Sequence, residues 1–244
     1  MKKQISVLNL LSKSSIYRMV GLFFMMGIVE FIFFRMVLLD GPNMETLTFN
    51  MEYVFRNARM NWIFGAALIL LTIILCATGY ETSSKQGYTL MRLSISEERV
   101  FELQALYNFL CYIFLWAVQL LIVFLLGLYF IKKAPGEYVT NQTFFLAFYR
   151  NEFLHALLPF DDILIWIKNG LLFLSLGFCS AGFTYAQRRG KRVFELVLAL
   201  GVAAIFFTAP LGKTERSIIT SFIFMFCFIL TSLRIYKKEG FDER

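Results

Sequence analysis

The sequence has few charged residues, few cysteines and a single histidine. Asp, Glu, Lys and Arg make up 17% of the 244 residues, whereas roughly 25% is usual for a soluble domain. The lone histidine, His155, excludes the two-histidine zinc helix and any site built from several histidines. The cysteines form no close pair along the chain, so we interpret them as small apolar residues: Cys76, Cys111, Cys179 and Cys227.

Motifs of nucleotide-binding proteins and of common enzymes are also missing. The tripeptide Gly-Lys-Thr at 212–214 matches the end of a phosphate-binding loop, but that loop needs a further glycine at position 207, which is Phe207. We find no serine-centred nucleophile elbow, no metal cluster and no acid–base pair that the sequence would bring together. We therefore expect a non-catalytic chain with no cofactor and no metal of its own.

Apolar residues are abundant, at 58% of the chain with 29 Phe, and they gather in long runs between short charged clusters. A bilayer core of roughly 30 Å needs about 20 mostly apolar residues in a helix. None of the runs alternates apolar and polar residues as barrel strands do. We expect an all-α, polytopic membrane protein with a single transmembrane domain over residues 1–244. The predicted spans are 19–39, 62–80, 106–131, 166–186, 193–209 and 217–235.

The placement of Lys and Arg predicts the orientation. They concentrate in the N-terminal segment, in the connections after the second and fourth spans, and in the C-terminal tail. Fewer lie on the other side, among them Lys168. Because cytoplasmic loops carry the excess of Lys and Arg, we place both termini in the cytoplasm and the protein in the plasma membrane. The net charge of +7 is then an orientation signal, and we expect no nucleic-acid partner.

A few polar residues interrupt the predicted spans. Glu30 lies in the middle of the first span, and an ionisable residue at that depth is costly enough to need a role. It could line a substrate or proton path, or hydrogen-bond at a helix interface, which we favour. Arg35 is close enough to the outer end to snorkel, and Asn108 and Gln119 suit interhelical hydrogen bonds. Small residues four apart predict close helix packing in the fourth span: Gly177, Ala181, Gly182 and Ala186.

Three connecting segments have amphipathic patterns. Residues 1–18 predict a short helix that lies on the cytoplasmic membrane surface. In the connection between the third and fourth spans, aromatic and apolar residues four apart predict a stripe on the outer leaflet: Phe145, Tyr149, Phe153 and Leu157. The cytoplasmic segment 81–97 is half apolar and too short to span.

The third helix is predicted to extend beyond the membrane. Ser94 and Glu97 have capping-box spacing at its start. From there to Ile131 a continuous helix would measure roughly 52 Å, longer than the bilayer core is thick. We expect its start to project into the cytoplasm and to hold the segment 81–97 toward a partner.

That segment carries a resemblance to a known family. The sequence Gly-Tyr-Thr-Leu-Met-Arg-Leu-Ser-Ile-Ser-Glu at 87–97, after the second of six spans, resembles the permease subunits of export-type ATP-binding-cassette (ABC) transporters of the type-2 class. The topology of most of the chain is similar as well, with 1–18 as the connecting helix and 81–97 as the coupling helix. The resemblance implies that these residues dock on an ATPase: Lys85, Gly87, Tyr88, Leu90, Met91, Arg92 and Leu93.

The resemblance also implies partners and a substrate class. It implies cytoplasmic ABC ATPase subunits that hold Mg-ATP, and a second permease, identical or different, within the lipid bilayer. The expected activity is export of an amphipathic compound such as a peptide, an antibiotic or a lipid. Other functions stay open: an ion- or proton-coupled secondary transporter or channel that uses Glu30, a membrane-embedded enzyme, or an assembly or immunity factor that binds a partner without moving substrate.

Overall fold

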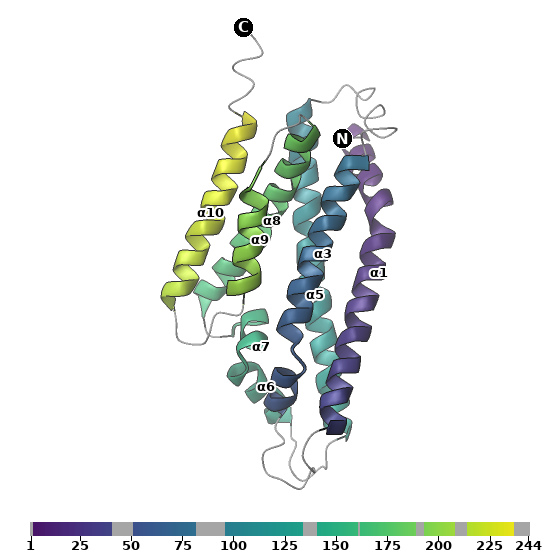
Figure 1. Ribbon diagram of the computed structural model, residues 1–244, viewed down its shortest axis with the longest axis vertical. Helices are drawn as coiled ribbons and strands as arrows, with labels where there is room; N and C mark the ends of the chain where they lie inside the picture. Colours follow the sequence, from purple (N-terminus) through teal and green to yellow (C-terminus); the bar gives the residue numbers. More distant parts are fainter. Residues whose placement is uncertain are drawn as a thin grey trace.

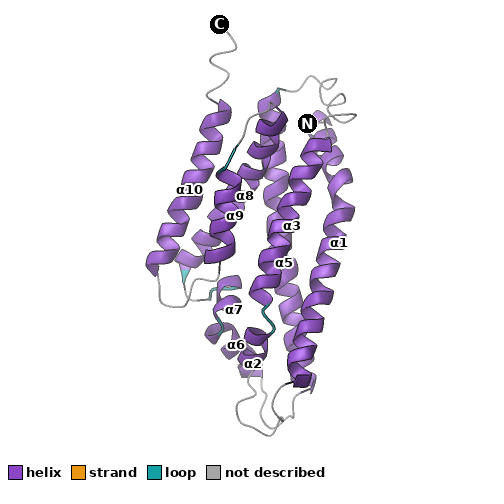
Figure 2. Ribbon diagram, in the orientation of Figure 1, coloured by secondary structure: helices purple, strands orange, loops and turns teal. Residues whose placement is uncertain are grey.

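The computed structural model describes residues 2–40, 51–81, 96–133, 141–160, 162–188, 193–207 and 214–236. Every regular element in these ranges is a helix (Figures 1 and 2), which confirms the expected helical fold. The helices are α1 (Lys2–Asp40), α2 (Met51–Asn57), α3 (Met60–Glu81), α5 (Glu97–Lys133), α6 (Asn141–Arg150), α7 (Glu152–Leu157), α8 (Ile163–Arg188), α9 (Glu195–Phe206) and α10 (Thr214–Tyr236).

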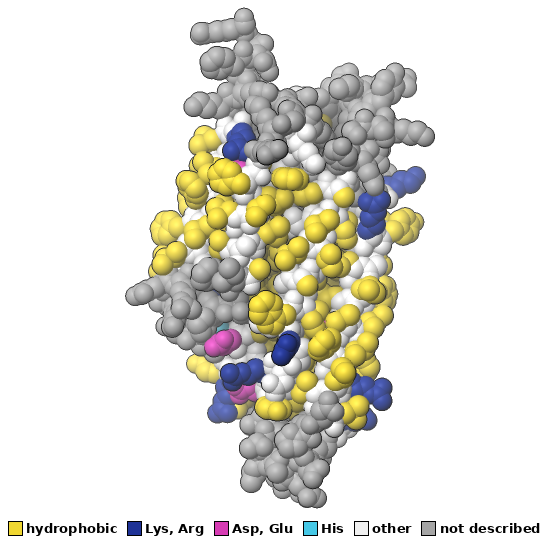
Figure 3. Space-filling model, viewed as in Figure 1, with side chains coloured by type: hydrophobic (Ala, Val, Ile, Leu, Met, Phe, Trp, Pro, Cys, Tyr) yellow, Lys and Arg dark blue, Asp and Glu magenta, His cyan; other side chains and the backbone are white. Residues whose placement is uncertain are grey.

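Four helices contain stretches long and apolar enough to cross a membrane: Ser15–Leu39, Met60–Ala77, Glu98–Lys133 and Ile163–Gln187. They match the first four predicted spans. The last two predicted spans correspond to shorter apolar stretches, Glu195–Ala204 in α9 and Ile218–Arg234 in α10. In Figure 3 hydrophobic side chains cover the middle of the molecule, and the charged ones lie toward its two ends. The chain is a helical membrane protein, and the count of six spans stays a prediction.

The long helices run side by side in an elongated bundle (Figure 1). The start of α1 and the end of α10 lie at one end, called here the terminal end. The short helices α2, α6 and α7 lie at the opposite end, called the distal end (Figure 1). The connections 41–50, 82–95, 134–140, 189–192 and 208–213 are outside the described residues.

The N-terminal segment differs from the expectation of a separate surface helix. Residues 2–18 belong to α1, which continues without a break to Asp40 over 39 residues. The segment holds no glycine or proline that would break the helix. Ser15 is fully buried and hydrogen-bonds Tyr107 of α5, so the first span is already packed against the bundle there. The structure therefore does not confirm a surface helix over 1–18.

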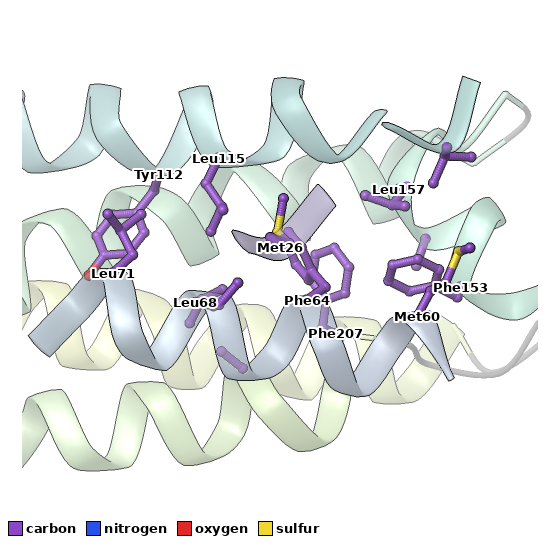
Figure 4. Packing of buried hydrophobic residues seen from close by; sticks show 14 of the residues in the cluster. Met26, Met60, Phe64, Leu68, Leu71, Tyr112, Leu115, Phe153, Leu157 and Phe207 are labelled. Atoms are coloured by element: carbon purple, nitrogen blue, oxygen red, sulfur yellow. The ribbon is translucent and has the colours of Figure 1, made fainter. Parts of the chain in front are cut away.

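The long third helix is confirmed. α5 runs from Glu97 to Lys133 over 37 residues, about 55 Å. It packs against α1, α3 and α8, and its opposite face is exposed, for example at Leu110, Phe114 and Leu121. Figure 4 shows Tyr112 and Leu115 of this helix facing Leu68 and Leu71 of α3.

The contact between α5 and α8 depends on a glycine. A Cβ atom placed on Gly177 would lie 3.0 Å from the backbone N and Cα of Phe109 on α5. That is closer than a methyl group packs against backbone, so only glycine fits without movement of a helix. The close approach predicted from the small residues of the fourth span is confirmed at this position.

At the distal end the predicted aromatic stripe is split in two. Phe145 and Tyr149 on α6 are exposed, whereas Phe153 and Leu157 on α7 are buried. The helix ends at Arg150, and Asn151 then caps a new one, its side-chain oxygen accepting hydrogen bonds from the backbone N–H groups of Phe153 and Leu154. The bend turns the second half of the stripe into the core, where Phe153 packs against the ring of Phe64.

Candidate functional site

Polar side chains on the inward face of α5 pair with the three long helices around it. We call this set the polar seam. Hydrocarbon offers no hydrogen-bond partners, so polar groups at this depth are stable only when other side chains satisfy them. The seam consists of Gln104, Tyr107, Asn108, Tyr112 and Gln119 on α5, with Ser15 and Glu30 on α1, Thr72 on α3, and Ser180 and Thr184 on α8.

Two amides of the seam join α5 to α8 in the half nearer the terminal end. The side-chain nitrogen of Gln104 donates to the hydroxyl of Thr184 at 2.9 Å, and that of Asn108 donates to the hydroxyl of Ser180 at 2.8 Å. Both hydroxyls in turn donate to carbonyls of their own helix. The interhelical hydrogen bond expected for Asn108 is confirmed. In each pair the amide of α5 is the donor and the hydroxyl of α8 is the acceptor, and the two pairs together fix the register between the helices.

Two hydroxyl pairs join α5 to its other neighbours. Tyr112 is fully buried and its hydroxyl lies 2.7 Å from that of Thr72 on α3. Because the Thr72 hydroxyl donates to the Leu68 carbonyl at 2.8 Å, it accepts from Tyr112. One turn or so nearer the terminal end, Tyr107 bonds Ser15 on α1.

The deepest pair of the seam joins Glu30 of α1 to Gln119 of α5. The Gln119 amide nitrogen donates to Oε1 of Glu30 at 2.8 Å, and both side chains are fully buried. The second carboxyl oxygen and the amide oxygen have no hydrogen-bond partner. A protonated carboxyl satisfies both atoms, because its O–H can donate to the amide oxygen, whereas an ionised carboxylate leaves two buried acceptors without a donor. The structure thus brings Glu30 and Gln119 together in a hydrogen bond between two helices, which is the role that we favoured for Glu30.

The remaining predicted site residues are Arg35 and those of the expected docking element. Arg35 is exposed on α1, toward the distal end. The expected docking element lies in 82–95, outside the described residues, and therefore stays a prediction: Lys85, Gly87, Tyr88, Leu90, Met91, Arg92 and Leu93. What the structure does describe is the helix that follows this element, since α5 begins at Glu97.

A second group of polar contacts, at the two ends of α9, was not predicted. The buried ammonium of Lys168 donates to the backbone carbonyl of Phe207 at 3.1 Å, just after α9 ends. At the start of α9, Glu195 is buried and pairs with Arg234 of α10 through two contacts of 2.5 and 3.1 Å. Both contacts suit the helix dipole, with an anion at the N-terminus and a cation at the C-terminus.

Two of the pockets on the surface are lined by described residues alone. An apolar groove of about 230 Å³ lies between α8 and α10, and its lining includes Leu171 and Met225. A polar pocket of about 240 Å³ lies at the distal end, between α2 and the α6–α7 bend. Neither is lined by Glu30 or Gln119.

Within the described ranges, no three His, Cys, Asp or Glu side chains gather where they could hold a metal ion. The comparisons with known proteins give no match to a family model and no significant match to a curated protein or a solved structure. The function must therefore be inferred from the geometry of the bundle. Its main feature is that α5 is hydrogen-bonded to α1, α3 and α8 at several depths.

Proposed function

We propose that the chain is the permease subunit of an export-type ABC transporter and forms the translocation pathway for an amphipathic peptide, antibiotic or lipid-like compound. In this proposal it spans the plasma membrane six times with both termini in the cytoplasm. It pairs with a second permease, identical or different, and with cytoplasmic ATPases that bind Mg-ATP. The resemblance of residues 87–97 to the family's coupling segment is the sequence basis of the proposal.

The observation that carries the proposal is the continuity of α5. The helix starts at Glu97, directly after the proposed docking element, and its length of about 55 Å exceeds the roughly 30 Å of a bilayer core. A push on segment 82–95 would therefore act on one rigid element. Because the polar seam bonds that element to three other helices, a displacement at its start would be passed to α1, α3 and α8 together.

The proposed mechanism follows from that connection. ATP binding would draw the two ATPases together and move the docking elements of the two permeases. α5 would carry the movement into the bundle, and the interfaces between the two permeases would open toward the outside. No step requires catalysis on this chain.

A second candidate is an ion- or proton-coupled transporter or channel that uses Glu30. The observation in its favour is a fully buried carboxyl group within a membrane span. Against it, Glu30 is paired with Gln119 and lines neither the apolar groove nor the polar pocket described above. If Glu30→Gln abolishes ion-dependent transport in proteoliposomes that contain no ATPase, this candidate replaces the permease.

The docking test compares matched charge reversals on the two sides of Glu97. Arg92→Glu lies in the proposed docking element, and Arg99→Glu lies on an exposed position of α5 seven residues later. After co-expression with an ABC ATPase, we expect the amount of co-purified ATPase to fall at least tenfold in Tyr88→Asp and in Arg92→Glu. The gel-filtration profiles of the two variants should be unchanged. Arg99→Glu should keep it. Equal recovery of the ATPase on all variants, or on none including the unmodified chain, would refute the docking element.

A further inference from the structure

The polar pocket at the distal end, called the distal pocket, contains charges of both signs. Its lining includes Glu52 and Arg56 of α2, and Arg150 and Glu152 on either side of the α6–α7 bend. In the described part of the chain none of these four side chains forms an ion pair with another. Two cations and two anions are therefore open to a ligand in one hollow of about 240 Å³.

The pocket lies at the level of one membrane surface. Asn61, which also lines it, is at the start of the membrane-spanning stretch Met60–Ala77. The neighbouring Trp62 is 74% exposed, and an exposed tryptophan at the end of a span is typical of the headgroup region. Figure 3 shows acidic and basic side chains next to each other at this end, directly beside hydrophobic ones.

An apolar surface adjoins the charges. Phe145, Leu146 and Tyr149 of α6 are all exposed, and Arg150, the next residue, lines the distal pocket. A ligand whose polar part enters the pocket can thus lay an apolar part along α6. This is the arrangement that an amphipathic lipid requires and that a small soluble zwitterion does not use.

We propose that the distal pocket binds the headgroup of a phospholipid with a primary ammonium group, the phosphoethanolamine class. The guanidinium groups of Arg56 and Arg150 suit the phosphate, because arginine donates paired hydrogen bonds to its oxygens. The carboxylates of Glu52 and Glu152 accept hydrogen bonds from the ammonium. Pockets for drug-sized ligands measure roughly 300–1,000 Å³, so the smaller volume of this one suits a headgroup.

The lining discriminates between headgroups. A choline headgroup has no N–H to donate and is recognised by the faces of aromatic rings. The two rings of the pocket, Phe55 and Phe153, are only 2% and 6% exposed, so their faces are covered. A glycerol headgroup has no cation for the carboxylates. The pocket therefore favours phosphatidylethanolamine over phosphatidylcholine and phosphatidylglycerol.

The test is lipid binding by the full chain, purified in detergent and freed of lipid, measured by native mass spectrometry. The three phospholipids are added with identical acyl chains, and we expect at least tenfold tighter binding of phosphatidylethanolamine. Equal affinities for the three would overturn the proposal, whatever the variants do. If free phosphoethanolamine displaces the lipid at equal concentration, the ligand is a soluble zwitterion and the lipid assignment is wrong.

Variants assign the charges. Glu52→Gln with Glu152→Gln should remove the preference over phosphatidylcholine, and Arg56→Gln with Arg150→Gln should weaken phosphatidylethanolamine binding at least tenfold. Arg99→Gln, an exposed arginine near the terminal end, is the matched control and should change neither value. Thermal unfolding of each variant verifies folding. Binding that is unchanged in both folded double variants would place the lipid elsewhere.

Discussion

The two sides of α8 show different ways of placing polar groups in a membrane bundle. On the side of α5 the contacts are neutral side-chain pairs, such as Asn108 with Ser180, spread along the interior of long helices. On the side of α9 and α10 they include charged groups that meet helix ends, Lys168 at Phe207 and Arg234 at Glu195. The neutral pairs set the register between two long helices, whereas the charged groups interact with the two ends of the short helix α9.

The length of α9 explains the difference. Its 12 residues measure about 18 Å, less than the roughly 30 Å of a bilayer core. In the predicted six-span topology its terminal N–H and C=O groups would lie where water is scarce, and an unsatisfied backbone group there is costly. The ammonium of Lys168 satisfies a carbonyl at one end of α9, and Glu195 introduces a negative charge at the other end, where the helix dipole favours it.

The largest effect is expected from breaking the charged pair at α9. Arg234→Gln leaves the buried Glu195 carboxylate without its cation and should lower the free energy of unfolding by about 3 kcal/mol. That is the low end for buried pairs, because Arg234 is 40% exposed. The double variant Glu195→Gln with Arg234→Gln should recover most of the loss in an SDS titration. A double variant as unstable as Arg234→Gln alone would contradict the charge argument.

The next effect concerns the close contact between α5 and α8. Gly177→Ala forces a methyl group against the Phe109 backbone and should cost about 1–3 kcal/mol of unfolding free energy. Gly170→Ala, on the same helix with open space around its Cβ, is the control. It should be neutral or stabilising by up to about 1 kcal/mol, as alanine usually is over glycine in a helix. Equal destabilisation by both substitutions would mean that the helices do not approach at Gly177.

A smaller effect is expected from a single neutral pair. Asn108→Leu removes the donor to Ser180, whose hydroxyl keeps its bond to the Gly177 carbonyl. Interhelical hydrogen bonds in membranes contribute about 0.6 kcal/mol on average, so we expect a loss of that order. In a double-mutant cycle, the loss in Asn108→Leu with Ser180→Ala should be smaller than the sum of the two single losses. An additive loss would show that the two side chains are not coupled.

The smallest effect is expected from Glu30→Gln. A glutamine keeps the shape of the carboxyl group, and its amide can donate to the Gln119 oxygen as a protonated carboxyl does. We expect a change below about 0.5 kcal/mol, whereas Glu30→Leu leaves both polar groups of Gln119 without a partner and should cost about 1–3 kcal/mol. Loss of folding or of transport in Glu30→Gln would mean that Glu30 acts as an ionised group.

The sequence predicted the long helices because their signals are local. Unbroken apolar runs are enough to predict them, α5 among them. The cap at Ser94 lies outside the described residues, and the extension of α5 beyond the bilayer stays a prediction. Glu30 and Gln119 stood out for the same reason, as polar residues within apolar runs. Their pairing could not be predicted, since the register of one helix against another depends on side chains from both.

The polar contacts of α9 were missed for a related reason. Lys168 was counted among the outer charges because it lies near the edge of a predicted span, and its burial follows from where α9 ends. The bend at Asn151 carried a usable signal, since asparagine followed by glutamate is typical of a helix start. The aromatic spacing of four across it favoured one continuous helix instead.

ATP hydrolysis by the purified complex in proteoliposomes tests the permease proposal most directly. We predict that the co-purified ATPase hydrolyses ATP at a different rate with the chain than alone. Arg92→Glu should abolish this difference, and Arg99→Glu should preserve it. A rate that is the same with and without the chain, or an identical response of the two variants, would contradict a function in which segment 82–95 and α5 connect an ATPase to the membrane bundle.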